Sequence, residues 1–217
     1  MGEGFKTVYW RTVEGDFGGR MARRIGILGG SFNPAHRGHL DLSLAAIHRL
    51  GLDQVWWLVS PQNPLKTTDG MAPFGERLAA ARAFAKGAAG DSRIKVTDLE
   101  SRLGTTYTAE TLELIRRRFP HHHFVWLMGA DNLAQISEWK DWQQIFHALP
   151  IAVFARPTYS LSALAAKAAR RYAPYRLREG AGRKLVMAKP PAWLFVHARL
   201  NPISATEIRK RRSKPRN

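Results

Sequence analysis

The chain has 217 residues, of which 45% are hydrophobic, and it carries a formal net charge of +17 and no cysteine. This length suits one domain with a sizeable core, and the lack of cysteine excludes a disulfide framework, a thiolate metal site and a cysteine nucleophile. Apolar stretches such as VWWLV (55–59) are too short to span a bilayer, and the N-terminus has no apolar signal segment, so a cytoplasmic protein without a membrane partner is expected.

In chain order, a loose extension at 1–20 is expected to precede the domain at 21–217, with Met21 as a candidate start. Apolar runs predict strands at 24–28, 55–60, 94–97, 124–128, 151–154 and 193–197, and apolar residues at helical spacing predict helices at 38–50, 74–86 and 109–119. The basic end RKRRSKPR (209–216) is interpreted first as a solvated tail and second as a binding segment. The oligomeric state does not follow from the sequence, and a homo-oligomer is left open.

Most of the predicted strands are continuous apolar runs separated by helices. Strands without polar alternation are typical of a parallel sheet covered on both faces. The sequence therefore predicts a single α/β domain with a doubly wound, Rossmann-like parallel sheet. Ligands of such folds bind beyond the carboxyl ends of the strands, where the strand order reverses.

The stretch GGSFNPAHRGHL (29–40) joins the first predicted strand to the first predicted helix. Its glycine pair allows a tight turn, the helix start presents free N–H groups, and His36 and His39 add two donors on one face. Gly38 leaves room for a phosphate to approach the backbone. The stretch therefore predicts a polyphosphate site. Three other interpretations are a histidine pair that caps the turn, a glycine-rich loop present by chance, and a two-histidine metal site. The third ligand of such a metal site would have to come from 121–123 at the opposite end of the sheet.

The same stretch resembles the G-x-F-x-P-x-H-x-G-H signature of the nucleotidyltransferase α/β superfamily, and ISATEIR (203–209) resembles its C-terminal I-S-x-T-x-x-R element. The segments SPQNPLK (60–66), GTTYTAETL (104–112) and GADNLAQISEWKDW (129–142) are similar to those of the bacterial nicotinate mononucleotide adenylyltransferases. This resemblance covers about residues 24–212. It implies the transfer of AMP from ATP to nicotinate mononucleotide in NAD biosynthesis, with release of pyrophosphate.

The resemblance also implies which residues carry the reaction. The attacking phosphate is already anionic, so catalysis would need positioning and charge neutralisation but no general base. Magnesium would be held by the ATP phosphates and water, with no metal-ligating side chain. The implied catalytic residues are His36, His39, Lys66 and Arg209, and the implied ATP-binding residues are Gly29, Gly30, Ser31, Phe32, Gly38, Asp131, Ser204 and Thr206.

Three of these residues also have an ordinary structural interpretation. Without the resemblance, Lys66 would be interpreted as an exposed loop lysine. Ser204 and Glu207 form the pattern of a capping box, and Asp131 suits a helix N-cap before LAQI. The chain also has Ala205 where most relatives of the superfamily have serine, so one hydroxyl that could contact phosphate is missing.

For the acceptor, the resemblance implies a pocket formed by Asn63, Tyr107, Thr108 and Trp139. Backbone N–H groups around Tyr107 and Thr108 would bind the pyridine carboxylate, and the ring would stack on Trp139. Donors of this kind favour the acid over the amide. Trp139 is otherwise an ordinary half-buried aromatic residue. Lys140 stands where many relatives have an aromatic residue, so the sequence does not identify the residue that forms the second wall of the pocket.

Three alternative functions remain at this stage. A nicotinamide mononucleotide adenylyltransferase would share the same motifs. A phosphopantetheine adenylyltransferase usually has threonine where His36 stands and is usually shorter. A basic nucleic-acid-binding protein without catalytic activity would account for the positive charge and would bind in a salt-dependent manner.

Overall fold

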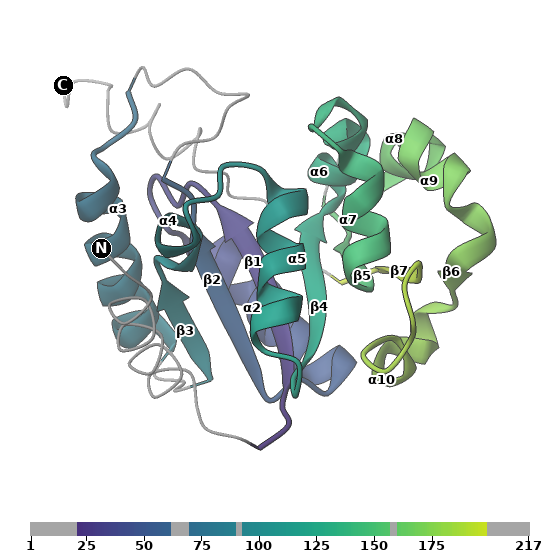
Figure 1. The fold of residues 1–217 in the computed structure, drawn as a ribbon, viewed down its shortest axis with the longest axis horizontal. Coiled ribbons are helices and arrows are strands. Elements are labelled where there is room, and N and C mark those ends of the chain that lie inside the picture. The colour runs from purple at the N-terminus through teal and green to yellow at the C-terminus, as the bar shows by residue number, and fades with distance from the viewer. Residues whose placement is uncertain (1–20, 62–69, 90–92, 157–159, 199–217) are drawn as a thin grey trace, which may run out of the picture.

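The protein forms one parallel sheet with helices on both faces. The computed structural model describes residues 21–61, 70–89, 93–156 and 160–198. Within these residues the sheet has seven strands in the order β3-β2-β1-β4-β5-β7-β6, all paired in parallel (Figure 1). The doubly wound α/β fold predicted from the sequence is confirmed. The strands are β1 (Arg24–Gly30), β2 (Gln54–Val59), β3 (Ile94–Thr97), β4 (His123–Gly129), β5 (Ile151–Phe154), β6 (Arg176–Leu177) and β7 (Trp193–Val196).

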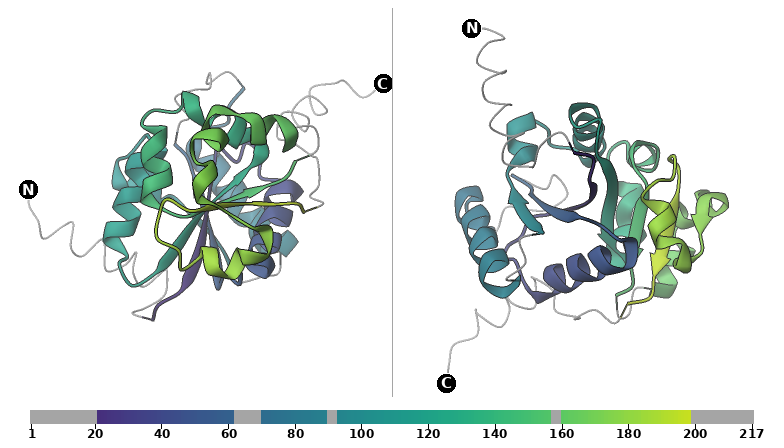
Figure 2. Two further views of the ribbon diagram at one scale, coloured as in Figure 1. Left: turned by 90° about the vertical axis from the view of Figure 1, so that its right-hand side faces the viewer. Right: turned by 90° about the horizontal axis from the view of Figure 1, so that it is seen from below.

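The helices lie on both faces of the sheet (Figure 2). Their buried side chains belong to two hydrophobic clusters, one on each face. One cluster receives side chains from α2 (Arg37–Leu50), α3 (Phe74–Phe84) and α10 (Gly182–Leu185). The other receives them from α4 (Leu99–Leu103), α5 (Thr108–Arg118), α6 (Ala130–Gln135), α7 (Trp142–Ala148), α8 (Ser160–Ala165) and α9 (Lys167–Arg171). No helix in the described part of the chain is long and apolar enough to cross a membrane.

Successive residues of a strand contribute their side chains to opposite clusters, because alternate side chains of a pleated strand point to opposite faces of the sheet. In β2, Trp56 and Trp57 are both fully buried but belong to different clusters. In β4, Trp126 and Leu127 divide in the same way. This burial on both faces explains why the strands are continuous apolar runs in the sequence.

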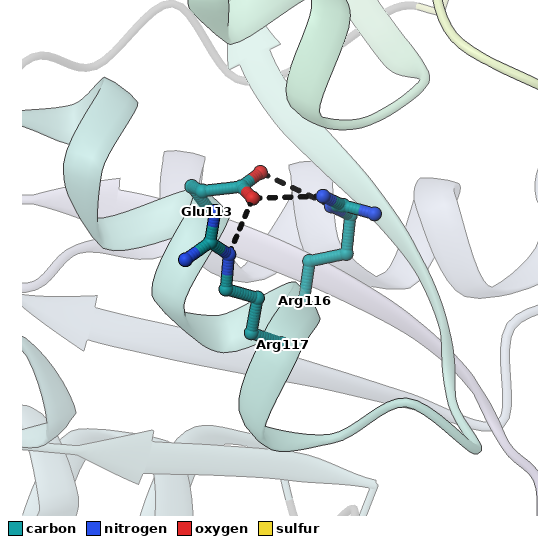
Figure 3. Close-up of polar contacts among 3 residues, drawn as sticks. All are labelled: Glu113, Arg116 and Arg117. Atoms are coloured by element: carbon teal, nitrogen blue, oxygen red, sulfur yellow. Dashed lines mark hydrogen bonds and ion pairs between the residues drawn. The ribbon is translucent and has the colours of Figure 1, made fainter.

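The predicted helices at 38–50, 74–86 and 109–119 correspond to α2, to α3 with the π-helical turn that follows it (Ala85–Ala89), and to α5. Helix α5 ends in three arginines, and Glu113 bridges two of them. The Glu113 carboxylate lies 2.7 Å from Arg116 Nη2 and 2.8 Å from Arg117 Nε (Figure 3). Because these side chains are exposed, the pairs contribute little stability, but they offset part of the local charge repulsion.

The position of the ligand site follows from the strand order. The chain passes from β1 to β2 on one side, whereas β4 pairs with β1 on the other side. The loops after β1 and β4 therefore diverge and leave a crevice at the carboxyl edge of the sheet. Helix α2 begins after the first of these loops and α6 begins directly after β4.

A buried arginine fixes the loops at this edge. Arg77 of α3 is only 3% exposed, and its guanidinium donates to four backbone carbonyls. Nη1 lies 2.6 Å from Ser31 O and 2.8 Å from Ser60 O, Nη2 lies 2.7 Å from Pro61 O, and Nε lies 2.9 Å from Ala72 O. Arg77 thus ties the loop after β1 to the end of β2 and to the segment that leads into α3.

Replacement of Arg77 is expected to loosen this edge. Arg77→Met keeps the length of the side chain but leaves four carbonyls without their donor, so the free energy of unfolding should fall by about 3 kcal/mol. Urea denaturation measures the change. Arg82→Met, on the exposed side of the same helix, should change it by less than about 0.5 kcal/mol. Equal losses in the two variants would show that the four hydrogen bonds do not stabilise the fold.

Candidate active site

The loop between β1 and α2 is folded tightly around Phe32. Phe32 has a φ of 45°, in the left-handed region that non-glycine residues rarely adopt, and its side chain is 1% exposed. Its ring centroid lies 5.1 Å from that of Trp57 and 4.6 Å from that of His39. The Asn33–Pro34 peptide bond that follows is cis. Burial of Phe32 against the sheet therefore turns the chain so that the next residues reach the start of α2.

The glycine pair of this loop lies at the end of β1. A Cβ at Gly29 would lie 2.5 Å from Trp126 Cη2, so the absence of a side chain lets the indole pass beneath the loop. A Cβ at Gly30 would meet only ordinary contacts, the nearest 3.4 Å away on the Phe32 ring. Ser31 offers its carbonyl to Arg77. The nucleotide contacts assigned to Gly29, Gly30, Ser31 and Phe32 stay predictions, but all four lie at the predicted edge of the sheet.

The two histidines form a reciprocal cap at the start of α2. His36 is the N-cap residue, and its Nδ1 accepts the Gly38 N–H at 3.1 Å. The His36 N–H in turn donates to His39 Nδ1 at 3.2 Å. The pair thus builds a capping box, a role usually taken by serine or threonine with glutamate. The capping interpretation is confirmed, and it places His36 at the N-cap rather than inside the first turn. The Gly38 N–H is occupied by His36.

These hydrogen bonds determine which ring nitrogen carries a proton. Because each Nδ1 accepts a backbone N–H, the proton of each neutral imidazole is on Nε2. Within the described residues neither Nε2 has a hydrogen-bond partner. Burial, and to a lesser extent the charge of Arg156, lower the pKa of His36 to about 4. Burial, followed by His36 and Arg156, holds the pKa of His39 well below 6.5. The pair therefore offers two neutral N–H donors at physiological pH.

Arg156 adds the positive charge that the histidines lack. It follows β5 at the carboxyl edge, and its Nε lies 3.4 Å from Asp131 Oδ1. Its charge lowers the pKa of both histidines. Gly129 leaves space for this ion pair, because a Cβ there would collide with the Asp131 carboxylate and lie 2.9 Å from Arg156 Nε. Sequence analysis missed Arg156, although its position directly after an apolar strand was the available signal.

Asp131 lies in the first turn of α6, but it does not cap that helix. The N-cap of α6 is Gly129, with no side-chain cap hydrogen bond, so the N-cap interpretation of Asp131 is wrong. The Asp131 carboxylate instead faces Arg156. The predicted contact of Asp131 with the adenosine ribose stays a prediction.

The predicted acceptor residues gather at the starts of two elements. Tyr107 is the N-cap of α5, without a side-chain cap, and Thr108 is the first residue of that helix. Trp139 ends the 3₁₀ turn η2 (Ile136–Glu138) and is half-buried against the core. Lys140, the residue after Trp139, connects η2 to the start of α5, because its Nζ lies 4.3 Å from the centroid of the Tyr107 ring. The structure thus brings Tyr107, Thr108 and Trp139 to the same edge of the sheet as the histidines.

Several predicted site residues lie outside the described residues. They are Asn63, Lys66, Ser204, Thr206 and Arg209, together with the predicted capping box at Ser204 and Glu207. Their roles stay predictions. For the metal interpretation, His123 begins β4 at the amino edge of the sheet, opposite to His36. Among the described residues, no group of three histidine, aspartate or glutamate side chains could hold a metal ion.

A buried carboxyl group supports the turn at Tyr107. Glu100 of α4 is 7% exposed, and Thr111 Oγ1 lies 3.4 Å from its Oε1 and 3.1 Å from Tyr107 O. Thr105 Oγ1 lies 2.7 Å from Thr111 Oγ1. Burial raises the pKa of Glu100 from 4.5 to about 7, although hydrogen bonds from Ser60 and Thr111 act in the opposite direction. This network joins the end of β2 to the start of α5.

The fold and the site together define a nucleotide-binding protein. A switch-point crevice, a helix N-terminus, two neutral imidazole donors and an arginine converge where a phosphate chain would lie. The profile of the cytidylyltransferase-like family matches residues 27–211. The chain therefore belongs to the cytidylyltransferase-like family, and it is a nucleotidyltransferase.

Named relatives agree with this assignment, and a solved structure agrees with the fold. The chain is 48% identical over 190 residues to a "probable nicotinate-nucleotide adenylyltransferase" of Ruegeria pomeroyi, covering 88% of this chain and 87% of the relative. It is 50% identical over 186 residues to a protein of the same name from Gluconacetobacter diazotrophicus, covering 86% and 85%. The fold is similar to that of the Plasmodium falciparum nicotinic acid mononucleotide adenylyltransferase solved with NaAD, with a TM-score of 0.65, 18% identity and coverage of 86% and 82%.

Removal of the Arg156 charge is expected to raise the pKa of His36. In Arg156→Met, burial still disfavours the charged imidazole, so the pKa should rise above about 4 and stay below 6.5. NMR titration of the histidine ring protons measures this change. Arg117→Met, on the outer face of α5, is the control and should leave His36 unchanged. An unshifted His36 in Arg156→Met would contradict the proximity of the two groups.

Glu100 is expected to make stability depend on pH. The folded chain holds the proton up to about pH 7 and the unfolded chain loses it near 4.5, so stability should fall as the pH rises between these values. At about 1.4 kcal/mol per pKa unit, the full loss approaches about 3 kcal/mol. Glu100→Gln removes this dependence, so its stability relative to the wild type should be greater at pH 8 than at pH 5.

Urea denaturation of both proteins at the two pH values measures the difference. Glu76→Gln, at an exposed position in the first turn of α3, serves as the control and should show no such pH dependence. A constant difference between Glu100→Gln and wild type at both pH values would mean that Glu100 is not buried in its neutral form.

Proposed function

We propose that the chain is a nicotinate-nucleotide adenylyltransferase, which transfers AMP from ATP to nicotinate mononucleotide in NAD biosynthesis. The products are nicotinate adenine dinucleotide and pyrophosphate. The observation that carries this proposal is the capping box of His36 and His39, which leaves two Nε2–H donors beside a helix N-terminus at the switch point. The names of the relatives support the choice of acceptor.

The reaction is an in-line displacement at phosphorus. A phosphate oxygen of nicotinate mononucleotide forms a bond to the α-phosphorus of ATP, and the bond from that phosphorus to the oxygen bridging the α- and β-phosphates breaks. Pyrophosphate leaves with the bonding electron pair. No proton has to be removed from the attacking oxygen, so the protein needs to align the two phosphates and neutralise their charge.

The described residues suit this task. The Nε2–H groups of His36 and His39 would donate to phosphate oxygens whose charge grows in the transition state, and the N-terminus of α2 adds a favourable dipole. Neutral donors keep their protons at any pH above their low pKa, so this contribution should not depend on pH in the neutral range. Arg156 would supply a fixed positive charge nearby. Lys66 and Arg209, which lie outside the described residues, are proposed to add two further positive charges.

Magnesium fits this site as a companion of ATP. The hydrogen-bond donors described at this site are imidazole and guanidinium groups. The carboxylate beside them, Asp131, forms an ion pair with Arg156. Because Mg²⁺ prefers oxygen ligands, it would be held by the triphosphate and water, and it would supply charge neutralisation there. The cytoplasmic location expected from the sequence belongs to the same proposal.

The acceptor would bind where α5 begins. The uncapped first turn of α5 after Tyr107 offers N–H groups to a carboxylate, and Trp139 offers a ring for stacking. Asn63 is proposed as a further contact. An amide would direct its own N–H₂ group at these donors and lose the hydrogen bond, which favours nicotinate over nicotinamide.

The function is tested by pyrophosphate release from ATP and Mg²⁺ with three acceptors at equal concentration: nicotinate mononucleotide, nicotinamide mononucleotide and phosphopantetheine. The fastest release is expected with nicotinate mononucleotide. His36→Asn should lower that rate roughly 100-fold, because asparagine retains an N-cap but lacks the imidazole donor. His39→Ala should also lose most of the activity.

His48→Ala, at the exposed end of α2, is the matched control and should retain the wild-type rate. Thermal denaturation of His36→Asn should show a stability close to wild type, which separates loss of chemistry from loss of folding. A faster rate with another acceptor would refute the acceptor assignment, and no release with any acceptor would refute the function and favour a nucleic-acid-binding role.

A further inference from the structure

Lys140 lies beside two of the predicted acceptor residues, Tyr107 and Trp139. It directly follows Trp139, and its Nζ lies 4.3 Å from the centroid of the Tyr107 ring. Its side chain is exposed, and within the described residues no carboxylate forms an ion pair with it. The ammonium group is therefore held by an aromatic face rather than by an acidic neighbour.

The backbone determines this placement. Trp139 is extended, with φ −79° and ψ 144°, and Asp141 is left-handed, with φ 52° and ψ 32°. The Trp142 N–H donates to Trp139 O at 3.2 Å, which closes a tight turn over these four residues. Trp142 is anchored in the core at 8% exposure. Lys140 is thus the second residue of a fixed turn, and its side chain extends toward the start of α5.

Two sources of positive potential meet at Tyr107. Tyr107 is the N-cap of α5 and has no side-chain cap, so the first turn of that helix presents its N–H groups and the positive end of its dipole. The Lys140 ammonium lies over the ring of the same residue. A carboxylate bound at this turn gains from both, whereas a neutral amide gains nothing from the full charge.

We propose that Lys140 is a specificity-determining residue that favours acceptors with an anionic carboxylate on the pyridine ring. This inference rests on the proposed function. The Lys140 ammonium, which lies over the Tyr107 ring, selects for the charge of the acceptor. Lys140 is not expected to contact the ATP phosphates, so its effect belongs to the binding of the acceptor.

The test compares two acceptors in Lys140→Met, which keeps the apolar stem and removes the charge. The KM for nicotinate mononucleotide should rise roughly fivefold, as expected for the loss of a solvent-exposed charge pair, while kcat and the KM for ATP stay unchanged. The kcat/KM for nicotinamide mononucleotide should stay constant, so the preference for the acid falls by the same factor. Lys140→Arg should retain most of the preference.

Ionic strength gives a second readout. Because salt screens an exposed charge, the preference of the wild type for the acid should decrease from 50 to 500 mM salt, and that of Lys140→Met should decrease less. Lys189→Met, which removes another exposed lysine, is the matched control and should behave as wild type. Equal effects of Lys140→Met on both acceptors, or no effect on either, would overturn the inference. Failure of the proposed function is distinct, because the wild type would then release no pyrophosphate with nicotinate mononucleotide.

Discussion

The site depends on a pair of hydrogen bonds from the backbone to imidazole nitrogens. Gly38 N–H donates to His36, and His36 N–H donates to His39, so both rings use Nδ1 to close the start of α2. Each Nε2–H is then directed away from the helix cap. The same contacts that begin a helix thus determine the tautomer and the orientation of two donors, and burial keeps both rings neutral. In both histidines Nδ1 closes the helix cap, whereas Nε2 can donate to a ligand.

This arrangement assigns hydrogen bonding and charge to different residues. The histidines supply directed N–H donors, whereas Arg156 supplies the full positive charge that a neutral imidazole lacks. Its partner Asp131 holds the guanidinium at the crevice, and Gly129 leaves space for both groups. A site of this kind is suited to a triphosphate, because both imidazoles stay neutral donors near neutral pH and the guanidinium offsets part of the phosphate charge.

The loops that carry the histidines are held in place by the burial of Phe32 and by the guanidinium of Arg77. Phe32 packs on Trp57 from an unfavourable backbone conformation, and Arg77 joins three backbone segments that the sequence places far apart. Glu100 performs a similar role for the turn at Tyr107, at the cost of a raised pKa. On the acceptor side, Lys140 places a cation over the ring of Tyr107.

The sequence by itself determined six strands of the sheet, the long helices and the phosphate-binding motif, but not the two-residue strand β6. Strands buried on both faces must be continuous apolar runs, and α2 and α5 have a clear helical period, so these elements were predicted to within two residues. The short helices α4 and α6 to α10 were not predicted, because five to seven residues hold too few turns for a periodic pattern, and α10 has only four. His36 and His39 were found by their motif, but their role as a cap was one of several interpretations.

Only the tertiary structure decided which distant residues meet. Arg77, Arg156 and Lys140 are three among 34 basic residues, and the local sequence around each does not reveal its partners. Arg77 matters because its helix lies beside the ends of β1 and β2, Arg156 because β5 ends near β4, and Lys140 because a tight turn aims it at α5. Such contacts depend on strand order and loop closure, which are properties of the whole chain, whereas periodicity and capping are properties of a few neighbouring residues.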